Sequence, residues 1–178
     1  MAFPAQIVRQ TFSVTALHIA AIIGYRRVMV KIVLDTYIIV RPVASPSRLA
    51  AELLRRTTAE GNLLCTSNFM LAELDRVLRY SRFRKIHGLS DTEIEDFVRS
   101  IQQVALVIDV EAAKSARVTR DRNDDPVIET ALRTKANYLC SIDKDIGAKD
   151  VVDHCKAFGV DIVSDTELIA LLRKLDLK

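Results

Sequence analysis

The stretch Val30-Lys-Ile-Val-Leu-Asp35 indicates the fold, because a short apolar run ends directly in a carboxylate. A run this short and this rich in β-branched residues is typical of a buried strand. Similar runs recur at 62–66, 104–109, 138–142 and 160–163, and helical patterns separate them. Strands that alternate with helices predict βαβ units. We therefore predict an α/β protein with three layers, α/β/α, around a central parallel sheet of about five strands.

Local signals place the helices between these strands. Ser45-Pro46 predicts a helix start, with an N-cap residue followed by proline at the first helical position, and Gly61 predicts its end. Ser67 is expected to cap the helix after the second strand. Ser90-Asp-Thr-Glu93 and Ser164-Asp-Thr-Glu167 are capping boxes that open two further helices. Helices are also expected over 111–118, 124–135 and 150–158.

The chain is predicted to hold one domain, residues 29–178, because no linker rich in Pro, Gly or Ser divides them. Residues 1–28 are expected to be an N-terminal extension, of the kind that an upstream start codon introduces. Polar residues interrupt its apolar stretch, so neither a signal peptide nor a membrane-spanning helix is expected. An additional amphipathic helix packed on the domain is the alternative.

The composition is that of an ordinary globular protein, with 49% apolar and 28% charged residues. A net charge of +3 is too small to indicate a nucleic-acid partner by itself. Cys65, Cys140 and Cys155 are odd in number and include no CxxC pair, which argues against a disulfide framework and favours a reducing cytoplasm. We expect a cytoplasmic protein without membrane attachment, whose cysteines fill space in the core.

Four acids are candidates to meet where the parallel strands end, which is the usual place for a working crevice. Asp35 directly follows the first strand and Asp143 the fourth. Asp124 begins the helix that returns into the fourth strand, and Glu73 lies about two turns into the helix after the second strand. Taken singly, each acid could instead be a helix cap or turn residue.

Such a group of carboxylates predicts a metal site. Close carboxylates repel one another, and a divalent cation commonly compensates for this. Ligands that are all oxygen suit Mg²⁺ or Mn²⁺. A bound ion of this kind can neutralise charge on a phosphodiester and activate water, which points to phosphodiester hydrolysis.

Four segments surround these acids: Val33-Leu-Asp-Thr-Tyr-Ile-Ile-Val40, Leu71-Ala-Glu-Leu-Asp-Arg-Val-Leu78, Asp121-Arg-Asn-Asp-Asp-Pro-Val-Ile-Glu-Thr-Ala-Leu132 and Ala136-Asn-Tyr-Leu-Cys-Ser-Ile-Asp-Lys-Asp-Ile146. In this order they resemble the successive motifs of the PIN domain (PilT N-terminus) family, whose members include toxins of VapBC-type toxin–antitoxin pairs. Val160–Ile169 is similar to the family's last strand and helix, so the resemblance extends over residues 29–174.

The resemblance implies a role for each acid. It implies that the catalytic and metal-binding residues are Asp35, Glu73, Asp124 and Asp143, with Mg²⁺ or Mn²⁺ as the cofactor. It implies accessory roles for Thr36, Asp121, Asp125, Ser141 and Asp145. Asp125 is also the alternative to Asp124, because the motif could be shifted by one residue. Two positions depart from the family's pattern, namely Tyr37 in place of Asn and Ile142 in place of Gly, and neither removes a metal ligand.

By this resemblance the chain is expected to be a metal-dependent endoribonuclease, the toxin of a type II toxin–antitoxin pair. Its expected partners are an RNA substrate, a small antitoxin protein and, as in many family members, a second copy of itself. An RNA-binding or RNA-processing module with little nuclease activity is the alternative. A receiver-like phospho-acceptor domain is disfavoured, because no acidic pair precedes the strand at Val30–Leu34.

Two groups of basic residues are candidates for contact with RNA. The first runs from a helix into an expected loop before Gly88 and comprises Arg76, Arg79, Arg82, Arg84 and Lys85. A solvated helix end is the alternative for this group. The second group, Arg117, Arg120 and Arg122, precedes Asp124, and pairing with the acids is its alternative.

Overall fold

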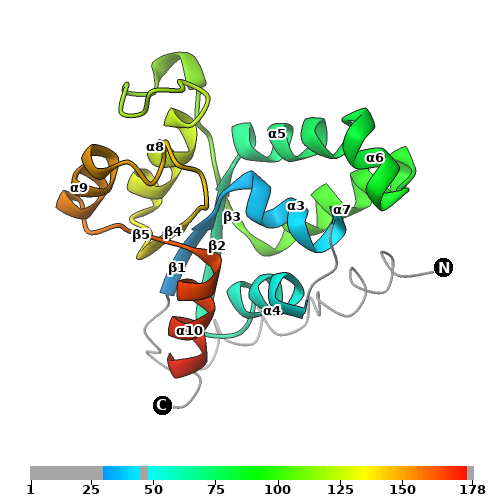
Figure 1. Ribbon diagram of the computed structural model, residues 1–178, viewed down its shortest axis with the longest axis horizontal. Coiled ribbons are helices and arrows are strands. Elements are labelled where there is room, and N and C mark those ends of the chain that lie inside the picture. The colour runs from blue at the N-terminus through cyan, green and yellow to red at the C-terminus, as the bar shows by residue number, and fades with distance from the viewer. Residues whose placement is uncertain (1–29, 45–47, 176–178) are drawn as a thin grey trace.

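The computed structural model describes residues 30–44 and 48–175 (Figure 1). Their strands form one parallel sheet with the order β3-β2-β1-β4-β5. The strands are β1 (Val30–Leu34), β2 (Asn62–Ser67), β3 (Leu106–Ile108), β4 (Tyr138–Cys140) and β5 (Asp161–Val163). β1 lies in the centre, so the acid that follows it emerges in the middle of the sheet's edge. The predicted parallel sheet is confirmed.

Helices cover both faces of this sheet (Figure 1). On one side lie α3 (Thr36–Ala44), α4 (Arg48–Thr57), α5 (Asn68–Leu78), α6 (Ser81–His87), α7 (Asp91–Val104) and α10 (Asp165–Leu175). On the other side lie α8 (Asp125–Thr134) and α9 (Lys149–Ala157). The predicted three-layer α/β/α architecture is therefore confirmed.

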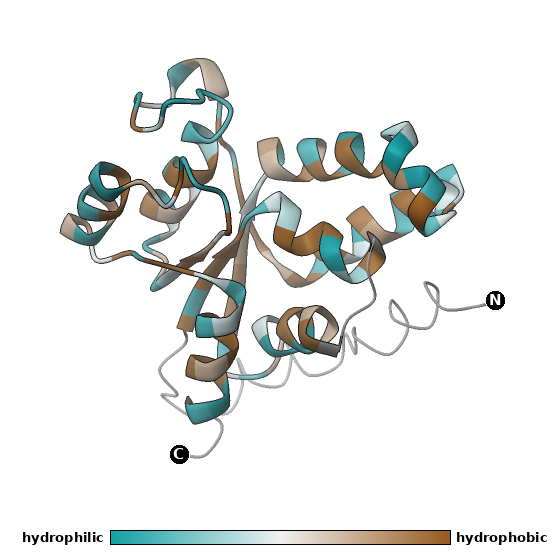
Figure 2. Cartoon of the chain, viewed as in Figure 1, coloured by the Kyte–Doolittle hydropathy of each residue, from teal (hydrophilic) through white to brown (hydrophobic). Residues whose placement is uncertain are grey.

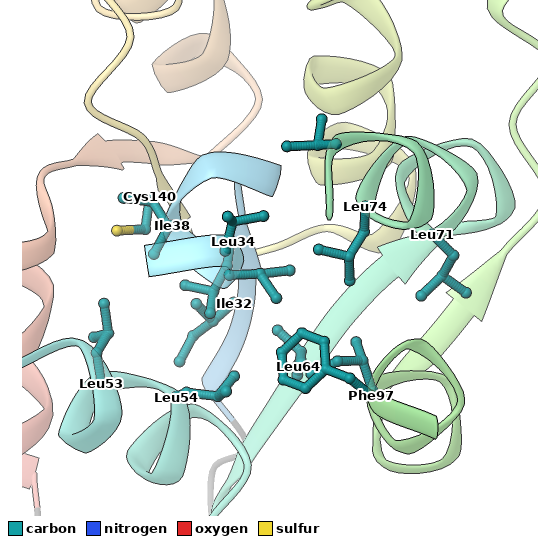
Figure 3. Packing of buried hydrophobic residues seen from close by; sticks show 14 of the residues in the cluster. Ile32, Leu34, Ile38, Leu53, Leu54, Leu64, Leu71, Leu74, Phe97 and Cys140 are labelled. Carbon is teal, nitrogen blue, oxygen red and sulfur yellow. The ribbon is translucent and has the colours of Figure 1, made fainter. Parts of the chain in front are cut away.

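The alternation of side chains along β1 explains why helices pack on both faces. Ile32 and Leu34 point into one apolar cluster and Val33 into the other, and all three are almost fully buried. In Figure 3, Ile32 and Leu34 lie between the leucines of α4 and Leu74 of α5. Val33 packs with buried residues of α8 and α9. Burial of each such side chain contributes roughly 1.5–3 kcal/mol, so a strand buried on both faces fixes both helical layers.

The predicted N-caps are present where the structure describes them, whereas α4 ends at Thr57, before the predicted Gly61. The Ser67 hydroxyl accepts from the Met70 amide at 3.3 Å. Ser90 and Glu93 form the capping box of α7. In the second box, Glu167 accepts from the Ser164 amide at 2.8 Å. The Ser45-Pro46 cap lies outside the described residues.

Two local predictions were wrong, and one helix was not predicted. No helix forms over 111–118, where the chain makes only a short 3-10 turn at Ala112–Lys114. The amides of Val118 and Thr119 bond instead to the carboxylate of Asp125, which removes them from any helical ladder. Helix α3 was not predicted, because its apolar run is β-branched and Pro42 lies within it. The basic segment before Gly88 is helix α6 and not a loop.

Other predictions of the sequence concern the chain as a whole. Among the described residues, no helix is long and apolar enough to cross a membrane. Cys65, Cys140 and Cys155 are free and buried, as expected for residues that fill the core. The predicted extension, residues 1–28, lies outside the described residues.

Candidate metal centre

The ends of β1 and β4 bring the first two acids together. Asp35 follows β1, and its amide donates to the carbonyl of Cys140 at the end of β4. The hydroxyl of Ser141 donates to Oδ2 of Asp35 at 2.6 Å and accepts from the amide of Asp143 at 3.0 Å. One hydroxyl thus connects the two acids that follow neighbouring strands.

The environment of Asp35 disfavours its negative charge. The residue is only 6% exposed, and burial raises the pKa of its carboxyl. Hydrogen bonds from the Ser141 hydroxyl and the Tyr37 amide oppose this rise in pKa, whereas the charges of Glu73 and Asp143 add to it. The repulsion indicates that carboxylates from three separate segments lie near one another.

Helix α5 supplies Glu73. Ser67 fixes the start of this helix, and buried Leu71 and Leu74 set which of its faces packs on the core. The Thr36 hydroxyl donates to Oε2 of Glu73 at 2.8 Å, and Arg76 Nη2 lies 3.6 Å from its Oε1. Thr36 therefore orients Glu73 as Ser141 orients Asp35.

Asp124 is the N-cap residue of α8, and its pKa is raised to about 7. Burial is the largest cause of this rise in pKa, and the charge of Asp143 is the next. Asp121, Asp35 and Glu73 contribute further repulsion. All four predicted acids therefore influence one another electrostatically, which is the situation that a divalent cation relieves.

Carboxylate oxygens of Asp124, Asp143 and Asp145 lie within 4.8 Å of one another. Opposite oxygen ligands of a Mg²⁺ ion are about 4.2 Å apart, so the spacing suits one ion. Asp145 donates its amide to Oδ1 of Asp143 at 2.7 Å, which keeps the two residues together. The donor set, all oxygen and mutually repulsive, fits Mg²⁺ or Mn²⁺. We refer to Asp35, Glu73, Asp124, Asp143 and Asp145 as the acid cluster.

Asp125, the alternative to Asp124, points elsewhere. It is 2% exposed, and its Oδ1 accepts from the amides of Val118 and Thr119 at 2.9 and 2.8 Å. Although burial opposes the charge of Asp125, these amides and the Thr119 hydroxyl lower its pKa overall. Asp125 therefore anchors a loop, and Asp124 faces the other acids. This anchoring could not be predicted from the sequence, because two adjacent carboxylates are indistinguishable there.

Asp121, the predicted outer acid, is exposed at the margin of the cluster. Its Oδ1 accepts from the amide and the side-chain nitrogen of Asn123, both at 2.9 Å. Its charge contributes to the raised pKa of Asp124. Asp121 thus lies close to the acid cluster, but the closest group of carboxylates does not include it.

The first basic group is partly engaged in ion pairs. Arg79 bonds to Asp75 at 2.8 Å and to Asp91 at 2.5 Å, and it approaches Glu95. Arg84 also pairs with Asp91. Arg76 faces Glu73, whereas Arg82 and Lys85 are exposed and pair with no acid among the described residues. The predicted RNA-binding residues are therefore not equivalent to one another.

The two departures from the family's pattern both lie at the surface. Tyr37 is 43% exposed and follows Asp35 and Thr36. Ile142 is 53% exposed and directly precedes Asp143. Neither side chain occupies the buried network of Asp35 and Ser141, so the departures leave that network intact.

Comparisons with known proteins give the family to which this chain is similar. A family model described as the PIN domain matches residues 31–145. No curated protein matches the sequence significantly. Among solved structures, a PilT N-terminus domain protein from the hyperthermophilic archaeon Sulfolobus solfataricus is similar. It shares 14% sequence identity over 80% of this chain and 92% of that chain, with a TM-score of 0.45. The range matched by the family model includes every member of the acid cluster.

Proposed function

The chain belongs to the PIN-domain family, and from this premise we propose that it is a metal-dependent ribonuclease. The observation that carries the proposal is the convergence of carboxylates from separate segments, with oxygens of Asp124, Asp143 and Asp145 within 4.8 Å of one another. Burial, and after it the charges of the neighbouring acids, raises the pKa of Asp124 to about 7, and a divalent cation is the ligand that compensates for such repulsion.

Several acids of the cluster offer ligand oxygens to this cation. Asp124, Asp143 and Asp145 offer oxygens close enough for one ion, and Asp35 and Glu73 offer further carboxylates beside them. When bound, Mg²⁺ or Mn²⁺ neutralises charge on the scissile phosphate and lowers the pKa of a bound water. The reaction proposed for the site is hydrolysis of a phosphodiester bond.

The hydroxyls of Ser141 and Thr36 keep the carboxylates in position. Each donates to a carboxylate oxygen, Ser141 to Asp35 and Thr36 to Glu73. A donated hydrogen bond restricts the rotamer of its acceptor, so these carboxylates remain oriented while substrate enters. Both hydroxyls are therefore positioning groups in the proposed mechanism.

The experiment is an incubation of the purified protein with labelled RNA and with DNA of the same sequence. We expect cleavage of the RNA in Mg²⁺ or Mn²⁺, no cleavage in excess chelator, and little cleavage of the DNA. Asp143→Asn, purified in parallel, controls for contaminating nucleases. If RNA is cleaved as fast in excess chelator as in Mg²⁺ or Mn²⁺, the proposal is contradicted. An absence of cleavage with every metal would favour an RNA-binding module instead.

We further propose that the ribonuclease is the toxin of a type II toxin–antitoxin pair, restrained by a small antitoxin. The support is the resemblance of the four acidic motifs to toxins of the family. Expression in a bacterial host should arrest growth, Asp143→Asn should not, and co-expression of a neighbouring small open reading frame should restore growth. Unimpaired growth on expression of the active enzyme would instead indicate general RNA processing.

A further inference from the structure

The acid cluster creates an electrostatic difficulty for an RNA substrate. Oxygens of Asp124, Asp143 and Asp145 lie within 4.8 Å of one another, and Ser141 joins Asp35 to Asp143, so many acidic side chains gather in one place. RNA carries a negative charge at each phosphate, and contacts from Lys and Arg provide most of the affinity of proteins for its backbone. Positive side chains that are free to bind phosphate must therefore lie near the cluster.

The basic residues of α5 and α6 largely fail this requirement. Arg79 and Arg84 share Asp91, and Arg79 also bonds to Asp75. An arginine already paired with carboxylates has to give up those contacts before it binds phosphate. The members left without an acidic partner among the described residues are Arg82 and Lys85, and Arg82 lies over the ring of Phe83, 5.0 Å from its centroid.

The loop before α8 provides a second group of cations. Arg117, Arg120 and Arg122 are exposed, and none of them makes a hydrogen bond or an ion pair with any residue that the structure describes. We call residues 117–122 the arginine loop. Figure 1 shows the segment between β3 and α8 at the end of the sheet toward which β1 runs, and Figure 2 colours much of it as hydrophilic.

The arginine loop is held in place from within. Oδ1 of Asp125 accepts from the amides of Val118 and Thr119, and the Thr119 hydroxyl lies 2.8 Å from the same oxygen. The amide of Asp124 donates to the carbonyl of Asp121 at 3.0 Å. The backbone on both sides of Arg120 and Arg122 is thus fixed before any ligand arrives, which lowers the entropy lost on binding.

We infer that Arg117, Arg120 and Arg122 bind backbone phosphates of the RNA beside the acid cluster. The inference rests on the proposed function, since it takes RNA as the ligand. The carbonyl of Asp121, which lies between Arg120 and Arg122, accepts from the amide of Asp124 at 3.0 Å, so the loop borders the cluster. A guanidinium can donate two parallel hydrogen bonds to a phosphate, and three unpaired arginines can hold successive phosphates of one strand.

The test measures binding apart from cleavage. Affinity for a fluorescently labelled single-stranded RNA is measured in excess chelator at a series of salt concentrations. Arg120→Gln with Arg122→Gln is compared with Arg82→Gln and Lys85→Gln, because each double variant removes two positive charges. For single-stranded nucleic acid, the slope of log affinity against log salt changes by about 0.7 for each phosphate contact.

We expect the first double variant to lose about 0.7 of slope per arginine, Arg117→Gln to lose as much, and the α6 variant to keep the wild-type slope. Arg120→Lys with Arg122→Lys should retain most of the slope, because the charges remain. Urea unfolding should change little in all of them, since these side chains make no hydrogen bond or ion pair with a described residue. Equal slopes for the two double variants, or no binding of RNA by the wild-type chain, would overturn the inference. RNA binding through the loop without metal-dependent cleavage would contradict only the proposed ribonuclease activity.

Discussion

The hydroxyl of Ser141 donates a hydrogen bond of 2.6 Å to Oδ2 of Asp35, and this contact joins the ends of the two neighbouring strands β1 and β4. The same hydroxyl accepts from the amide of Asp143 at 3.0 Å. Acids from two distant segments are thereby held by one small side chain, and their relative position depends on it.

Ser141→Ala should weaken metal binding and destabilise the chain. The variant leaves the buried carboxylate of Asp35 without its side-chain donor, so the pKa of Asp35 rises further. Because the folded state of the variant then binds the proton of Asp35 still more tightly, the loss of stability should be larger at pH 8 than at pH 5. We expect a decrease of about 1–3 kcal/mol in the free energy of unfolding. Urea unfolding and calorimetric Mn²⁺ titration measure both effects, and unchanged Mn²⁺ affinity would contradict the role given to Ser141.

Asp124→Asn should change the pH dependence of stability in the absence of metal. The pKa of Asp124 rises from an ordinary value of 3.8 to about 7 in the folded chain, so the folded state binds this proton more tightly than the unfolded state does. Its contribution to stability is therefore present below about pH 4 and lost as the pH rises toward 7. In chelator, the Asn variant should gain stability relative to wild type between pH 5 and 8.

Mg²⁺ provides the control for this pH effect. In wild type a bound divalent cation favours the charged carboxylate, so excess Mg²⁺ should reduce the destabilisation above pH 7. Thermal unfolding at a series of pH values, with and without Mg²⁺, checks both statements. A constant difference between wild type and Asp124→Asn across this pH range would show that Asp124 does not titrate as described.

Asp125→Ala should lower the free energy of unfolding strongly, in contrast to a substitution of Asp124. Removal of the Asp125 carboxylate leaves the amides of Val118 and Thr119 without their acceptor, at a cost of about 3 kcal/mol. It should also release the arginine loop. Asp124→Asn should keep the fold at neutral pH. Chemical unfolding of the two variants at pH 7 compares them, and equal destabilisation would mean that Asp124 and Asp125 have been assigned to the wrong roles.

Much of the sheet and most of its helix starts could be predicted because their signals are local. The apolar run at Val30–Leu34 and the capping box at Ser90 each depend on residues close together in the sequence. The end of the segment over 111–118 could not be predicted in this way, because the amides of Val118 and Thr119 bond to Asp125, several residues along the chain. A side chain outside the segment therefore holds the backbone at its end.

Local sequence signals were also insufficient to predict all the contacts of the candidate site. Motifs could indicate which acids matter, but not that Arg79 and Arg84 are engaged by Asp91 of another helix. That contact exists because α5 and α7 pack together, and packing partners are not visible in local sequence. Adjacent carboxylates such as Asp124 and Asp125 were likewise distinguishable only after the fold had turned one of them inward.

Arg79→Gln should affect stability without affecting RNA binding. The side chain is 31% exposed and pairs with Asp75 and Asp91 near solvent, so the substitution should lower the free energy of unfolding only slightly. The salt dependence of RNA affinity should remain that of wild type. A decrease of slope equal to that of Arg120→Gln would mean that Arg79 leaves its ion pairs to bind phosphate.

The rate of RNA cleavage by Asp35→Asn in excess Mg²⁺ tests the central claim, that the acid cluster is a metal-dependent ribonuclease site. The substitution keeps the size of the side chain but removes one anionic ligand, so the rate should fall about 100-fold or more. The fold should persist, and its stability in chelator should be equal or higher, because one repulsive charge is gone. A wild-type rate in Asp35→Asn, with metal still required, would contradict this account and move the metal site elsewhere.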